Sequence, residues 1–104
     1  MTDIHQGDIY WAPLADPDAV GTSITHPHVV VQPDVLNHSR IQTVVVCALT
    51  SNLRRASLPG NVLLDAGEAN LPRQSVVEVS KVSTVEKARL GTYIGTLSAP
   101  RVAQ

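Results

Sequence analysis

The run of residues from Thr43 to Leu49 (TVVVCAL) constrains the fold of this chain more than any other stretch. Three consecutive valines followed by Cys, Ala and Leu are typical of a strand that is buried on both faces of a sheet. The run stops abruptly at Thr50, Ser51 and Asn52, three small polar residues. We therefore expect a sheet that is organised around this strand, with a polar rim where the strand ends.

A second strand is expected over Val29–Gln32, and the tripeptide His26-Pro27-His28 introduces it. A residue that precedes proline is held out of helical geometry, which gives His26 a fixed position at the entrance of the strand. Imidazole exchanges a proton near neutral pH, so a histidine at a rim can act as an acid or a base. If the two strands are neighbours, His26 and Thr50 converge on one rim. Otherwise His26 is an ordinary surface histidine.

The rest of the chain predicts short strands separated by turn-rich loops at 16–25, 53–60 and 65–75. Further strands are expected over Ile4–Leu14, Asn61–Leu64, Val76–Val82 and Tyr93–Leu97. One helical turn is expected at Pro33–Asn37, and Ser83-x-x-Glu86 matches a capping box, which predicts a short helix that ends near Leu90. The pattern indicates a mainly β chain with short helices, folded as a small barrel in a single domain over residues 1–104.

Composition narrows the class of protein. Charged residues make up 16% of the 104 residues, below the roughly 25% of an average globular domain, which indicates a surface committed to a partner. The net charge of −1 provides no general attraction for nucleic acid, so RNA or DNA would have to bind a local patch.

Cys47 is the single cysteine, and His5, His28 and His38 show no metal-ligand spacing, so we expect no disulfide, metal or cofactor. Neither a signal peptide nor a membrane span is recognisable, and we expect a cytoplasmic protein.

Two groups of polar residues could bind an anion, and each has a plainer interpretation. Thr50–Asn52 could hold a phosphate through hydroxyl and amide donors, or could form an ordinary turn after the strand. Arg54 and Arg55, in the loop that follows, could pair with phosphates or could point into solvent. Arg40 is a further candidate across the rim.

Several short motifs follow one another in a recognisable order. They are GDIYW at 7–11, PHVVVQPDVLN at 27–37, LTSN at 49–52, LPGNV at 58–62, SV at 75–76, TVEKARL at 84–90 and LS at 97–98. No single motif is specific, but their order resembles that of the MazF/PemK (Kid) family of toxins. The resemblance covers residues 6–98, which is nearly the whole chain.

This resemblance implies an SH3-like β-barrel of the CcdB/MazF/Kid type that works as a homodimer. It also implies the toxin of a type II toxin–antitoxin system, neutralised by a cognate antitoxin protein that covers the RNA groove. Such toxins cleave single-stranded RNA at specific sequences without a metal, by attack of a ribose 2′-OH that leaves a 2′,3′-cyclic phosphate. Compared with the family, the C-terminal helix that follows Ser98 is shortened.

The resemblance also assigns residue roles. The family's catalytic Thr at the end of the central strand matches Thr50, whereas its catalytic Arg, directly before the proline of the second strand, is replaced by His26. Three outcomes follow for His26: it transfers protons itself, a neighbouring Arg supplies the positive charge, or activity is weak. The further residues expected to bind RNA are His28, Ser51, Asn52, Arg54, Arg55 and Lys81.

Two alternatives use the same barrel without RNA cleavage. One is a catalytically weak or silent MazF-like protein that only binds an antitoxin. The other is a gyrase-directed toxin like CcdB, which uses a Trp-bearing C-terminus that the residues at 101–104 (RVAQ) do not provide.

Overall fold

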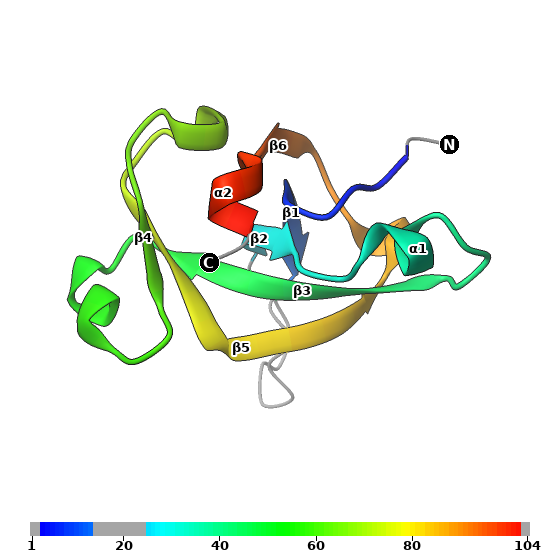
Figure 1. Ribbon diagram of the computed structural model, residues 1–104, viewed down its shortest axis with the longest axis horizontal. Helices are drawn as coiled ribbons and strands as arrows, with labels where there is room; N and C mark the ends of the chain where they lie inside the picture. Colours follow the sequence, from blue (N-terminus) through cyan, green and yellow to red (C-terminus); the bar gives the residue numbers. More distant parts are fainter. Residues whose placement is uncertain (1–2, 14–24, 103–104) are drawn as a thin grey trace.

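A curled antiparallel sheet of six strands forms the body of the protein (Figure 1). The computed structural model describes residues 3–13 and 25–102. The strands are β1 (Asp8–Pro13), β2 (Thr25–Val30), β3 (Thr43–Thr50), β4 (Val62–Leu64), β5 (Ser75–Glu86) and β6 (Tyr93–Thr96). The helices are the single turns α1 (Asp34–Asn37) and α2 (Ala99–Val102) and the 3₁₀ turns η1 (Leu53–Ser57), η2 (Glu68–Asn70) and η3 (Lys87–Arg89). The predicted mainly β class is confirmed. The loop predicted at 16–25 lies outside the described residues except for Thr25, which begins β2.

β3 lies inside the sheet, whose strand order is β4-β5-β3-β2-β1-β6. Its alternate residues contribute to two core clusters, Cys47 and Leu49 to one and Val44 and Val46 to the other. All four side chains are buried. The prediction of a strand buried on both faces is therefore confirmed. A polar residue on either face of this strand would be placed in a hydrophobic core.

The prediction that a helix begins at the capping box of Ser83–Glu86 is wrong, because β5 continues as a strand to Glu86. Ser83, Thr84 and Val85 pair with Val46, Val45 and Val44 of β3. β-Branched residues favour the extended backbone, and pairing along a buried strand provides hydrogen bonds that an exposed single helical turn cannot match. Only residues 87–89 form a helical turn, η3.

β5 bulges strongly where it passes the middle of β3. Cys47 pairs with Val82 while Leu49 pairs with Val77, so four residues of β5 lie opposite Ala48 alone. The bulge places Glu78 in the interior, with 3% of its surface exposed. Two cations compensate this buried charge: Arg55 Nε lies 3.3 Å from Glu78 Oε1, and Lys81 Nζ lies 3.7 Å from Oε2.

The first and last strands along the sequence are neighbours in the sheet, since β1 pairs with β6. Gly95 of β6 lies so close to η2 that a Cβ atom added there would be 2.1 Å from the carbonyl oxygen of Ala69. Only glycine allows this approach. Asn70 Nδ2 donates a hydrogen bond to Ile94 O at 3.2 Å, so η2 is held firmly against β6.

Polar contacts hold α1 against the N-terminal segment. The Oδ1 atom of Asp34 accepts hydrogen bonds from the backbone N–H of Gln6 at 2.6 Å and from Nδ2 of Asn37 at 3.1 Å. The backbone hydrogen bond from Gln6, and then that from Asn37, lower the pKa of Asp34 below its ordinary value. At the other end of the chain, the Arg101 guanidinium pairs with Glu68, with Nε and Oε2 2.8 Å apart. Within the described residues, no helix has the length and apolar character needed to cross a membrane.

Candidate functional site

His26 of β2 and Thr50 of β3 line one cavity of about 620 Å³. The register explains their meeting: His28 pairs with Ala48, and His26 and Thr50 lie two residues further along each antiparallel strand. β2 begins at Thr25, four residues before the predicted start, so His26 is part of the strand rather than its approach. Both side chains are partly exposed to solvent. The two residues that the sequence suggested would converge therefore share one rim.

Other elements complete the cavity on all sides. β1 contributes one residue, the segment between η2 and β5 several, and β6 two. The residues that line it besides His26 and Thr50 are Trp11, Thr25, Pro27, Leu49, Ser51, Asn70, Leu71, Pro72, Arg73, Ser75, Tyr93 and Ile94. The site thus depends on the five strands β1, β2, β3, β5 and β6 and on the contact between η2 and β6.

The hydroxyl group of Thr50 is oriented by the turn that follows it. Its Oγ1 accepts a hydrogen bond from the backbone N–H of Asn52 at 3.2 Å. The hydroxyl proton is not used in that bond and can be donated to an anion. Asn52 Oδ1 accepts from the backbone N–H of Arg54 at 3.2 Å, which caps η1. Asn52 therefore has a structural part in the turn, while Ser51 is exposed and lines the cavity.

Arg73 is the cavity residue that the sequence did not reveal. It is exposed, and it is the one Lys or Arg among the described residues that line the cavity. No acidic side chain among the described residues lies within 4.0 Å of its guanidinium, so its charge is available for an anionic ligand. Arg73 belongs to the loop predicted at 65–75, and no local pattern marks it. Only the packing of η2 and β5 brings it to His26 and Thr50.

Two exposed aromatic side chains lie in the same cavity. The exposed fractions are 40% for Trp11 and 49% for Tyr93, which is high for such large side chains. Tyr10 is buried instead, and its ring packs edge-on against Tyr93 with the ring centroids 5.5 Å apart. Burial, followed by the nearby Asp8 carboxylate, raises the pKa of Tyr10 to about 12. The cavity therefore offers two aromatic surfaces for flat ligand groups.

The structure corrects the role predicted for His28. Its exposed fraction is 1%, and its ring Nδ1 donates a hydrogen bond to the carbonyl oxygen of His26 at 2.8 Å. Burial lowers the pKa of His28 below its ordinary value. A side chain in this position cannot contact RNA without leaving the core. It supports the backbone of His26 instead.

The basic residues predicted to bind RNA lie outside the cavity. Arg55 and Lys81 pair with the buried Glu78 of the β5 bulge, which offsets part of their charge. Arg54 is exposed on η1 and does not line the cavity. Arg54 and Arg55 belong to η1, which packs on β5, and Lys81 belongs to the β5 bulge opposite Ala48.

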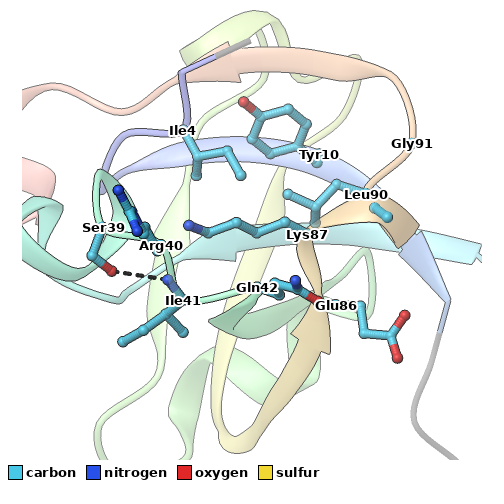
Figure 2. Close-up of a pocket in the computed structure, with 11 residues that line it drawn as sticks. Ile4, Tyr10, Ser39, Arg40, Ile41, Gln42, Glu86, Lys87, Leu90 and Gly91 are labelled. Atoms are coloured by element: carbon cyan, nitrogen blue, oxygen red, sulfur yellow. Dashed lines mark hydrogen bonds between the residues drawn. The ribbon is translucent and has the colours of Figure 1, made fainter. Parts of the chain in front are cut away.

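A second cavity, of about 690 Å³, contains Arg40, the further candidate for the rim (Figure 2). Apolar side chains of Ile4, Tyr10, Ile41 and Leu90 line it, and Lys87 extends across it between Ile4 and Ile41. Lys87 Nζ donates a hydrogen bond to the carbonyl oxygen of Asn37 at 2.8 Å. Arg40 therefore lies away from His26 and Thr50, and this cavity lacks the imidazole and hydroxyl groups of the first.

Side chains with metal-binding atoms gather at neither cavity but beside α1. Ligand atoms of His5, Asp34 and His38 all lie within 4.8 Å of one another. The sequence did not indicate this cluster, because Asp34 lies 29 positions after His5 (34 − 5) and the fold brings the two together.

The first cavity combines an imidazole, a hydroxyl, a guanidinium without an acidic partner among the described residues, and two aromatic rings on a small curled β-sheet. These groups suit the binding of an anionic ligand that carries flat aromatic groups. Comparison with known proteins then assigns the chain to a family. Residues 5–104 match the model of the family described as PemK-like, MazF-like toxin of type II toxin–antitoxin system. The chain belongs to this family of toxins.

Individual relatives support the same family. Endoribonuclease MazF6 of Mycobacterium tuberculosis is 40% identical over 96 residues, which cover 92% of this chain and 84% of that protein. The solved structure of M. tuberculosis toxin MazF-mt6 matches with a TM-score of 0.72 and 25% identity, covering 92% of this chain and 88% of the other. A mycobacterial endoribonuclease in complex with its cognate antitoxin shares the fold, with a TM-score of 0.71 and 20% identity over 99% of this chain and 85% of that one.

Proposed function

We propose that this toxin is an endoribonuclease that cleaves single-stranded RNA in the cavity shared by His26, Thr50 and Arg73. The observation that carries the proposal is the presence at one open rim of an imidazole, a hydroxyl whose oxygen already accepts a hydrogen bond, and a guanidinium that has no acidic partner among the described residues. The endoribonuclease relatives support RNA as the substrate. In the reaction, a ribose 2′-oxygen attacks the adjacent phosphorus and the bond to the 5′-oxygen breaks. The products are a 2′,3′-cyclic phosphate and a free 5′-OH.

Each of the three side chains suits one part of this reaction. Imidazole can remove the proton of the 2′-OH or deliver a proton to the leaving 5′-oxygen. Thr50 donates its hydroxyl proton to a phosphate oxygen, because its own oxygen already accepts from Asn52. Arg73 supplies the permanent positive charge that stabilises the pentacovalent phosphorane, whereas an imidazole that has given up its proton carries no charge. We therefore favour the outcome in which His26 transfers protons and a neighbouring Arg supplies the charge.

Trp11 and Tyr93 extend the proposal to RNA bases. Aromatic side chains that are exposed beside a phosphate-binding group stack well on the flat faces of unpaired bases. Stacking favours single-stranded over double-stranded RNA, since the bases of a duplex are already stacked on one another. Ser51, at the end of β3, is a further polar contact for the strand.

We also propose that the toxin works as a cytoplasmic homodimer and is inhibited by a cognate antitoxin. The antitoxin complex of the mycobacterial structural neighbour supports such a partner. Four valines support self-association: Val31, Val79 and Val82 have exposed fractions of 36%, 44% and 53%, and together with Val102 they line one groove. Apolar side chains gathered in this way mark a surface that a protein partner covers.

Incubation of the purified protein with a long single-stranded RNA in EDTA tests the activity. We expect cuts at a limited set of sequences, with 5′-OH and 2′,3′-cyclic phosphate ends that can be mapped by ligation. The EDTA inactivates contaminating ribonucleases that need a metal. The Thr50→Val protein, purified in parallel, controls for contaminating ribonucleases that do not. RNA that stays intact, in the presence of a protein that still binds the antitoxin, would establish the silent binding protein instead.

Substitutions at Arg73 and His26 test the division of roles. Arg73→Gln removes the charge and keeps a polar, though shorter, side chain, and we expect it to lower kcat by about 10²-fold or more. Arg89→Gln is the matched control, because Arg89 is exposed and, among the described residues, forms an ion pair with the exposed Glu86 alone. We expect His26→Ala to lower the cleavage rate by about 10²–10⁴-fold, the span of general acid–base catalysis.

The His26→Arg variant decides between the remaining explanations. If Arg73 supplies the charge and His26 the proton transfer, His26→Arg is slower than wild type. A variant that is faster than wild type, and is no longer slowed by Arg73→Gln, would show that His26 is merely a weak substitute for the family arginine.

A further inference from the structure

His5, Asp34 and His38 form a cluster outside the proposed RNA site. The rings of His5 and His38 meet edge-to-face with their centroids 4.8 Å apart. Nδ1 of His5 lies 3.8 Å from Oδ2 of Asp34, and one ligand atom from each of the three residues lies within 4.8 Å of the others. A zinc ion with bonds of about 2.0–2.1 Å holds its ligand atoms roughly 3.3–3.5 Å apart, so small side-chain rotations suffice to close the cluster on a metal.

The carboxylate of Asp34 is already positioned for such a role. Its Oδ1 accepts hydrogen bonds from the Gln6 N–H and from Asn37 Nδ2, which leaves Oδ2 directed toward His5. Hydrogen bonds of this kind orient a ligand before the metal arrives and are typical of metal sites. Asp34 and His38 are four residues apart, and the N–H of His38 donates to the carbonyl oxygen of Asp34 at 2.9 Å, so both side chains lie on one side of a helical turn.

The third ligand is equally well supported by its backbone. The N–H of His5 donates to Oδ2 of Asp8 at 2.9 Å, and the N–H of Asp8 donates to the carbonyl oxygen of His5 at 3.0 Å. This closed turn fixes the N-terminal segment where it approaches α1. All three ligand side chains remain exposed, so a metal ion can reach them from solvent.

We propose that His5, Asp34 and His38 form a binding site for a divalent transition metal of the zinc class. Two imidazole nitrogens and one carboxylate oxygen suit Zn²⁺, Ni²⁺ or Cu²⁺ rather than Mg²⁺ or Ca²⁺, which need more oxygen ligands. Water completes the coordination. The site lies apart from the cavity of His26 and Thr50, and cleavage of RNA does not depend on it.

A bound metal would affect the shape of the second cavity. Ile4 and Ser39, which line that cavity, are the sequence neighbours of His5 and His38 (Figure 2). A metal that joins the two histidines would fix the N-terminal segment relative to the loop after α1. It would thereby set the distance between these two sides of the cavity and stabilise the folded chain.

Titration of the chelator-treated full chain with Zn²⁺, followed by calorimetry, tests the site. We expect one Zn²⁺ per chain and a rise of the unfolding temperature with Zn²⁺ concentration. Co²⁺ serves as a second probe, because histidine and carboxylate ligands give it visible absorption bands. His5→Ala and His38→Ala should each raise the Kd for Zn²⁺ at least 10-fold. Loss of a hydrogen-bond partner of a metal ligand already weakens binding by about 10-fold or more, and these variants remove a ligand itself. Both side chains are exposed, so these variants should remain folded.

His26→Ala is the matched control, since it removes a histidine from another part of the molecule and should leave the Kd for Zn²⁺ unchanged. Asp34→Asn keeps an oxygen acceptor for Gln6 while removing the negative charge, and should also weaken binding. Absence of Zn²⁺ binding overturns the proposal, as does binding that His5→Ala and His38→Ala leave unchanged. Because the RNA assay is performed in EDTA, its result is independent of this one.

Discussion

The backbone N–H of Asn52 donates a hydrogen bond to the Thr50 hydroxyl oxygen, and this leaves the hydroxyl proton of Thr50 to be donated to a ligand. Thr50→Val keeps the shape and removes the hydroxyl, so we expect RNA cleavage to fall by about 10²-fold. Thr50→Ser retains the hydroxyl and should keep most of the activity. The free energy of unfolding should change by only about 1 kcal/mol, as for the loss of one partly exposed hydrogen bond. Cleavage rates and urea unfolding of both variants check these values, and equal rates for Val and Ser would mean that Thr50 is only a turn residue.

The buried imidazole of His28 should make stability depend on pH. Burial lowers its pKa in the folded protein below the ordinary value of 6.5. The unfolded chain therefore takes up a proton at a higher pH than the folded chain does. This contribution to stability is complete above pH 6.5 and is lost as the pH falls through the lower pKa of the folded protein. Urea unfolding between pH 7.5 and 5 should show a decrease.

His28→Gln, which cannot titrate, isolates this effect. We expect the variant to lose less stability than wild type over the same range of pH, whatever its stability at pH 7.5. An identical loss in both proteins would assign the pH dependence to other groups.

At the scale of elements, the contact between η2 and β6 keeps one side of the cavity of His26 and Thr50 in place. Gly95→Ala would put a methyl group 2.1 Å from the carbonyl oxygen of Ala69, so the two backbones must separate. We expect a loss of about 1–3 kcal/mol in the free energy of unfolding, together with slower cleavage because Asn70 and Leu71 move. Gly67→Asn is the control. A Cβ atom added there meets open space, so only the strain of a side chain at a φ of +85° remains, and we expect a smaller loss of stability than for Gly95→Ala.

The elements also show how far the sequence predicts the fold and the site. The β3 strand and the meeting of His26 with Thr50 were predictable, because a long apolar run and a His-Pro step are local signals. The capping box at Ser83 was misleading, since pairing of β5 with β3 overrides a short helical pattern. Arg73 and the partners of Glu78 had no local signal. Their positions follow from a bulge and from packing between distant segments.

At the scale of the whole molecule, the groove lined by Val31, Val79, Val82 and Val102 should determine the oligomeric state. Sedimentation at micromolar concentration should show a species near twice the chain mass of 11.1 kDa. Val82→Glu places a charge among Val31, Val79 and Val102 and should give monomers. Val35→Glu, at an 80% exposed position of α1 outside the groove, is the control and should remain dimeric. A wild-type protein that stays monomeric over this range would remove self-association from the proposed function.

The pairing of β1 with β6 joins residues that are far apart in the sequence into one cavity. Trp11 of β1 and Tyr93 of β6 both line the cavity of His26 and Thr50. Because contacts between distant segments form late in folding, we expect this cavity to be complete only after β6 has paired with β1. A folding intermediate in which β6 is still unpaired would lack the wall that Tyr93 and Ile94 provide.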